Sequence, residues 1–104
     1  MSITVMNQAI PILTEPFVRA GVYPTSEQAM KHIILDYIER QISWAEVEIE
    51  YFERKYKKSF SEWSKNLMRK ATVTEEDDWM EWESLRDMVV GWRELKTEVE
   101  YSNV

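Results

Sequence analysis

The side chains most able to do chemistry in this sequence are five carboxylates close together in its last third: Glu75, Glu76, Asp77, Asp78 and Glu81. Carboxylate oxygens are preferred ligands of divalent cations such as Ca²⁺. Successive residues of a helix point in different directions, however, so these side chains cannot converge on one ion. Acidic residues in the first turn of a helix are stabilised by its dipole. We therefore interpret the cluster as a helix start and predict no metal ion or other cofactor.

The remaining groups do not predict a catalytic centre. The chain has one histidine, His32, and no cysteine. A catalytic histidine needs a nucleophile or a second base within hydrogen-bond reach, and the spacing of residues identifies no such partner. Phosphate-binding, zinc-binding and nucleophile-elbow motifs are absent from the sequence. We interpret His32 as structural and predict that the protein is not an enzyme.

Composition favours a small helical protein. The chain has 104 residues, 44% of them hydrophobic and 31% charged, with only two glycines and three prolines. So few chain breakers favour long helices over a fold with many turns. No apolar run approaches the ~20 residues of a membrane span, and the N-terminus lacks the features of a signal peptide. We expect a cytoplasmic protein with no membrane partner.

The net charge of −6 is concentrated near the C-terminus, because residues 75–104 carry ten acids and three bases. Such a segment repels nucleic acid and suits a basic protein partner. The alternative is a solvated helix face that keeps the chain soluble.

The longest predicted element is a helix from Thr25 to about Lys58. Thr25 is followed three residues later by Gln28, which is the spacing of a capping box. Apolar residues then recur at alternating spacings of three and four, which predicts packing along most of the helix. This heptad seam consists of Leu35, Ile38, Ile42, Ala45, Ile49, Phe52 and Tyr56.

Two further helices are predicted after the long one. Ser59 and Glu62 form a second capping box, which opens a short helix from about Phe60 to Arg69. Thr74 can cap a last helix that ends near Val99. Its apolar stripe consists of Trp82, Leu85, Val89, Trp92, Leu95 and Val99.

The N-terminal segment predicts a strand, because residues 2–6 alternate between polar and apolar types. A single strand must pair with another chain or lie at an edge. A short helix follows, with Thr14 as N-cap and Gly21 just beyond its end. This is the order of a ribbon–helix–helix module, in which two chains pair their strands and present them to the DNA major groove.

The predicted fold is therefore mainly α, with a short N-terminal strand that pairs in a dimer, one long helix and two further C-terminal helices. Residues 1–42 would form the dimerisation module and residues 43–104 a helical extension. The expected dimer core is Ile3, Val5, Ile34 and Ile38. The candidate DNA-facing residues are Ser2, Thr4, Met6, Ser26 and Lys31.

The chain also resembles a known family. The stretch from Ile3 to Gln41, which contains PILTEPFVRAGVYPTSEQAMKHIILDYIERQI, is similar to the N-terminal module of ribbon–helix–helix-type antitoxins of bacterial and archaeal type II toxin–antitoxin pairs. The segments FERKYKKSFSEWS and EEDDWMEWESLRDMVVGWREL resemble the continuation. The resemblance implies a homodimer or higher oligomer that binds operator DNA and neutralises a basic toxin. The outward ribbon residues include no Arg or Lys, so we expect DNA binding to be weak or absent.

The acidic last helix is rich in tryptophan, and tryptophan is a frequent interface anchor. Its candidate partner-binding residues are Trp79, Trp82, Glu83 and Trp92, with Trp79 as the exposed anchor. The alternative is that the tryptophans are core residues at helical spacing. The alternative function is a non-enzymatic helical oligomerisation or adaptor protein without a toxin.

Overall fold

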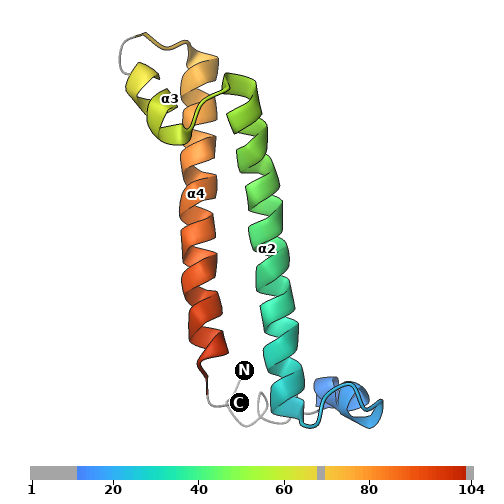
Figure 1. Ribbon diagram of the computed structural model, residues 1–104. Helices are drawn as coiled ribbons and strands as arrows, with labels where there is room; N and C mark the ends of the chain where they lie inside the picture. The colour runs from blue at the N-terminus through green and yellow to red at the C-terminus, as the bar shows by residue number, and fades with distance from the viewer. Residues whose placement is uncertain (1–11, 68–69, 103–104) are drawn as a thin grey trace.

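Two long antiparallel helices form the body of the molecule (Figure 1). The computed structural model describes residues 12–67 and 70–102. Within these ranges the chain contains four helices and no strand. A first helix covers residues 12–19 and is followed by α2 (Ser26–Tyr56), α3 (Phe60–Leu67) and α4 (Val73–Glu100). At 1.5 Å per residue, α2 is about 46 Å long and α4 about 42 Å. They run side by side, while the short α3 packs on α4 at one end of the hairpin (Figure 1).

The ends of these helices follow from local capping. The Thr25 hydroxyl accepts a hydrogen bond from the backbone N–H of Gln28 at 3.1 Å, which confirms the predicted start of α2. The helix stops after Tyr56, where Lys57 adopts a left-handed conformation with φ of 53°. The Ser59 hydroxyl likewise accepts from the N–H of Glu62 at 3.2 Å and so opens α3.

The start of α4 corrects one prediction. Its N-cap is Thr72, two residues before the predicted Thr74. Glu75 stands three residues after Thr72, and its carboxylate accepts from the Thr72 backbone N–H while the Thr72 hydroxyl accepts from the Glu75 N–H. This reciprocal box satisfies two of the free N–H groups at the helix start. Because Thr72 has Glu at that spacing, it outcompetes Thr74.

The first helix ends as the sequence predicts but begins earlier. Gly21 has a φ of 76°, a value that glycine adopts readily and other residues rarely adopt. The N–H of Val22 donates to the carbonyl of Phe17, and the N–H of Gly21 donates to that of Val18, both at 3.0 Å. These are the two hydrogen bonds of a Schellman motif. Thr14, the predicted N-cap, lies inside the helix and is buried.

The core of the hairpin is the contact between the heptad seam of α2 and the apolar stripe of α4. Most of both patterns is confirmed as the buried face of its helix; the exceptions are Leu35, which is not part of the core cluster, and Leu95, which is exposed. The fully or nearly buried apolar residues of this contact are Ile38, Ile42, Ala45 and Phe52 from α2 and Trp82, Leu85 and Val89 from α4. Each seam is therefore covered by the other within one chain.

The predicted ribbon–helix–helix fold is wrong. The described chain is an all-helical hairpin, and α2 runs without a break through the predicted module boundary at residues 42 and 43. Ile38, expected in a dimer core, is buried against α4 of its own chain. The segment 2–6, with Ile3 and Val5, lies outside the described residues. The reason for the correction is that two long apolar stripes bury far more surface against each other than a five-residue alternation can offer.

Candidate interaction face

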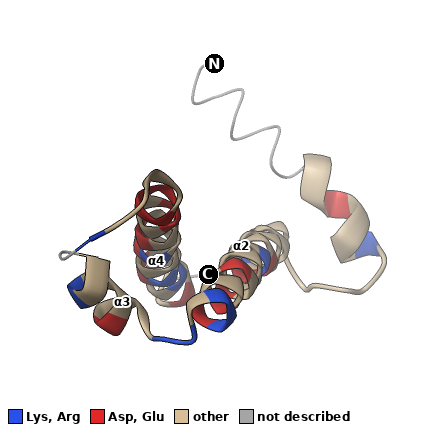
Figure 2. Ribbon diagram, turned by 90° about the horizontal axis from the view of Figure 1, so that it is seen from above, with Lys and Arg blue, Asp and Glu red and all other residues tan. Residues whose placement is uncertain are grey.

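The α2–α4 hairpin has two different sides, and on one of them ion pairs join the two helices. Arg93 of α4 pairs with Glu46 of α2. Lys96 pairs with Glu39 and, at 3.6 Å, with Glu100. The hydrogen bond with Glu39 raises the pKa of Lys96 above its ordinary value. Basic and acidic residues are interleaved on both long helices when they are viewed from above (Figure 2).

The other side of α2 carries a second apolar stripe. Tyr37, Trp44 and Tyr51 are spaced seven residues apart, so they lie on one line along the helix. Their exposed fractions are 55%, 52% and 51%. Ile33 and Val47 lie in the same stripe and are also exposed. Tyr37 and Tyr51 each touch one other ring of the described chain, Trp92 and Phe52, and about half of every side chain in the series stays exposed.

A matching stripe on α4 continues this surface across the hairpin. Met88 and Leu95 are seven residues apart and are each partly exposed. Trp92, between them in sequence, packs its ring edge-to-face against Tyr37 with the centroids 5.8 Å apart. This ring contact places the two stripes on the same side of the molecule. We call this surface the apolar face; its residues are Ile33, Tyr37, Trp44, Val47, Tyr51, Met88, Gly91 and Leu95.

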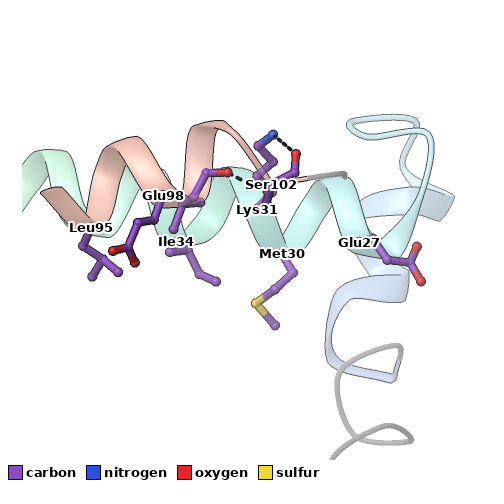
Figure 3. A pocket seen from close by; sticks show the side chains of 8 residues that line it. Glu27, Met30, Lys31, Ile34, Leu95, Glu98 and Ser102 are labelled. Atoms are coloured by element: carbon purple, nitrogen blue, oxygen red, sulfur yellow. Dashed lines mark hydrogen bonds between the residues drawn. The ribbon is translucent and has the colours of Figure 1, made fainter. Parts of the chain in front are cut away.

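At the open end of the hairpin the apolar face runs into a groove of about 400 Å³ (Figure 3). Met30 and Ile34 of α2 and Leu95 of α4 project to the same side there. Lys31 points the opposite way, and its ammonium donates to the backbone carbonyls of Glu100 at 3.1 Å and Ser102 at 3.4 Å. The lining of the groove also includes two acidic residues, Glu27 and Glu98, whereas the cation of Lys31 is used to hold the two helix ends together.

Gly91 lies on the α4 stripe, three residues after Met88 and four before Leu95. It is in the middle of α4 and exposed. Glycine inside a helix costs about 1 kcal/mol relative to alanine. A Cβ atom built at Gly91 would meet nothing within 4 Å. The packing of the hairpin therefore does not explain why the smallest residue occupies this position.

The tryptophans predicted to bind a partner serve largely to pack the hairpin. Trp82 is fully buried and stacks on Phe52 with the centroids 5.8 Å apart. Trp79 is partly buried, and its Nε1 donates to the hydroxyl of Ser64 in α3 at 2.8 Å. Trp79 is thus engaged by its own chain and is not the free anchor that the sequence predicted. Trp92 is partly buried beside the apolar face, and Glu83 is partly exposed on α4.

A polar cluster near α3 clamps the end of α2 to the start of α4. The Asp78 carboxylate accepts hydrogen bonds from the Tyr56 hydroxyl and, at 2.6 Å, from the Lys55 ammonium. Burial, followed by the bond to Asp78, raises the pKa of Tyr56 to about 12. Burial acts to raise the pKa of Asp78, but the bonds from Lys55 and Tyr56 outweigh it and lower this pKa. Every group in the cluster is satisfied by another, so the arrangement stabilises the fold.

The candidate DNA-facing residues are not gathered into a site in the described chain. Ser26 is the first residue of α2, and Lys31 is bound to the end of α4. Ser2, Thr4 and Met6 lie outside the described residues. Among residues 12–67 and 70–102, no three His, Cys, Asp or Glu side chains come together as a metal site. No helix in the same ranges is long and apolar enough to span a membrane.

Comparisons with protein families, with characterised proteins and with solved structures found no match to this chain. The geometry of the apolar face is therefore the main guide to function. The main seam of α2 was predicted from the sequence, but the series of Tyr37, Trp44 and Tyr51 was not. The signal was present in the sequence, because three aromatic residues at intervals of seven form a second heptad series on the same helix.

Proposed function

We propose that the protein acts without catalysis, as a helical oligomerisation or adaptor protein whose working surface is the apolar face. The observation that carries the proposal is the half-exposed heptad series of Tyr37, Trp44 and Tyr51. Aromatic side chains supply much of the binding energy of protein interfaces. Their heptad spacing fits another helix packed along α2.

The size of the apolar face also supports binding to a protein. From Ile33 to Tyr51 it extends about 27 Å along α2. Two helices side by side are roughly 20 Å wide, so the footprint is about 540 Å². This lies within the range of about 300–600 Å² that is typical of the largest apolar patch of a monomeric protein, and such a patch is often functional. The footprint is too long and too open for a small-molecule pocket, which would enclose most of its ligand.

A second candidate is the antitoxin function, and one observation favours it. Five acidic residues follow each other along one line of α4 at spacings of seven and four: Glu76, Glu83, Asp87, Glu94 and Glu98. A basic toxin would suit this line. Its binding would be separable from that of the apolar face, because attraction to an acidic surface weakens as salt rises.

Site-specific photo-crosslinking in the native host tests the proposal. A photoreactive amino acid replaces Trp44 on the apolar face or, as a matched control, Ser43 among the charged residues on the other side. We expect a covalent adduct with protein from position 44 and none from position 43. Absence of adducts at position 44, or equal adducts at both positions, would contradict the proposal. The mass of the adduct tells whether the captured protein is a second copy or a different chain.

A further inference from the structure

We infer that the occupant of the apolar face is a second copy of this chain, so that two hairpins pack into a four-helix bundle. The inference rests on the proposed function, because it assumes that the apolar face binds protein. It adds the identity of the partner and the residues that fit together.

The first reason is that the apolar face carries a large projection and a small residue at the same height. Trp44 is the largest side chain of the face, and Gly91 is its smallest residue. Glu39, five residues before Trp44, forms an ion pair across the hairpin with Lys96, five residues after Gly91. Because α2 and α4 are antiparallel, the step from Glu39 to Trp44 and the step from Lys96 back to Gly91 lead in the same direction by the same rise. Trp44 and Gly91 therefore lie at about the same level on adjacent helices.

A two-fold axis parallel to the helices brings these residues together. This rotation places α2 of one copy over α4 of the other without changing the level of any residue. Trp44 of each copy then lies over Gly91 of the other, between Met88 and Leu95. A surface that meets its own copy must contain both the projection and the space that receives it. A different partner would require only one of them.

This packing also accounts for the glycine. Side chains at a helix contact insert between residues of the facing helix, and a glycine in that position gives the most room for an indole. Within one hairpin Gly91 has open space where its Cβ would be. The cost of glycine in a helix is thus explained by a contact that forms only between copies.

The area of the apolar face is similar in magnitude to the area that each partner buries in a stable dimer. A standard interface buries about 800 Å² per partner. The flat footprint of about 540 Å² understates the accessible area, because side chains project from helices about 10 Å in diameter. The groove lined by Met30 and Ile34 extends the same surface further.

Electrostatics gives this dimer a distinctive response to salt. Each chain has a net charge of −6, so two copies repel each other. Two charged residues, Arg40 and Glu48, stand among the aromatic rings of α2, and Arg40 is paired with Asp36 at 2.9 Å. Salt screens the repulsion and leaves apolar contacts intact. Association of two copies should therefore strengthen as salt is added.

Sedimentation equilibrium on the full chain tests the inference. The wild-type protein should show twice the chain mass of 12.5 kDa. Trp44→Gln and Gly91→Gln should each weaken the dimer at least tenfold. Val90→Gln is the matched control, because Val90 is next to Gly91 and also exposed but lies on the line of Thr97, toward the ion pairs. It should leave the dissociation constant within a factor of two.

Circular dichroism of each variant shows whether the hairpin is still folded. Gly91→Gln should keep or increase the helical signal, since glutamine is the better helix former. If the Gly91→Gln variant unfolds, the effect of Trp44→Gln on the dissociation constant alone tests the inference. A wild-type chain that is monomeric at every concentration overturns the inference, and so does a dimer that neither variant weakens. If the chain is monomeric but position 44 crosslinks to a different protein, the inference fails while the proposed function stands.

Discussion

Replacing Trp82 with alanine should greatly reduce the free energy of unfolding, whereas the same change at Trp44 should not. Trp82 is fully buried, and its ring packs against Phe52, Tyr56 and Phe60. Truncating a buried tryptophan costs about 3–5 kcal/mol, because the surrounding side chains do not fill the cavity. Domains of this size have stabilities of about 5–15 kcal/mol. The described chain has only eight buried apolar residues, which favours the lower end of that range.

Trp44 is the matched control, since it is the same residue type on the same hairpin. Half of its side chain is already exposed, so truncation in the monomer should change the unfolding free energy by less than about 1 kcal/mol. Trp82→Phe adds a second comparison. The buried Nε1 of Trp82 has no hydrogen-bond acceptor in the described chain, so phenylalanine loses apolar contacts but no hydrogen bond.

The assay is urea unfolding followed by circular dichroism at a protein concentration low enough for the monomer to dominate. Trp82→Ala should lower the urea midpoint strongly, Trp82→Phe moderately and Trp44→Ala hardly at all. At high protein concentration the effect of Trp44→Ala should grow, because a dimer stabilises the folded chain by mass action. Equal effects of the two alanine variants in dilute solution would refute the assignment of Trp82 to the core and Trp44 to the surface.

Three further predictions concern single interactions and the whole chain. Thr72→Ala should cost about 1 kcal/mol in thermal unfolding, whereas Thr74→Ala should cost much less; the reverse order would contradict the observed cap. The pKa of Tyr56 is raised from 10.0 to about 12, so its contribution to stability is complete below pH 10 and is lost as pH rises toward 12. A Tyr56→Phe variant should show a shallower loss of urea midpoint over that range than wild type, and parallel curves would count against the Asp78 contact. Raising the NaCl concentration from 50 to 500 mM should lower the dissociation constant of the dimer; an increase would indicate that opposite charges hold the copies together.

Local sequence was enough to predict most of the helical structure. Thr25 and Ser59 mark helix starts, and Gly21 marks a helix end, because each acts through hydrogen bonds or backbone angles within a few residues. The heptad seam was also readable, since periodicity identifies which side of a helix is apolar. The N-cap of α4 could not be identified in the same way. Thr72 and Thr74 are each followed three residues later by an acidic residue, and these differ only in side-chain length, Glu75 against Asp77.

Tertiary structure alone decided what covers each apolar surface. The pattern that contains Ile38 shows that one side of α2 must be buried, but it is the same whether the cover is another chain or α4. The strong apolar stripe of α4 settled this within the chain. By the same logic, periodicity placed Trp82 on the apolar stripe and Trp79 off it, but it could not show that Trp79 is held by Ser64 of α3, because that contact joins two different helices. The apolar face around Trp44 emerged only once α4 had covered the opposite side of α2, since exposure is what remains after all long-range contacts have formed.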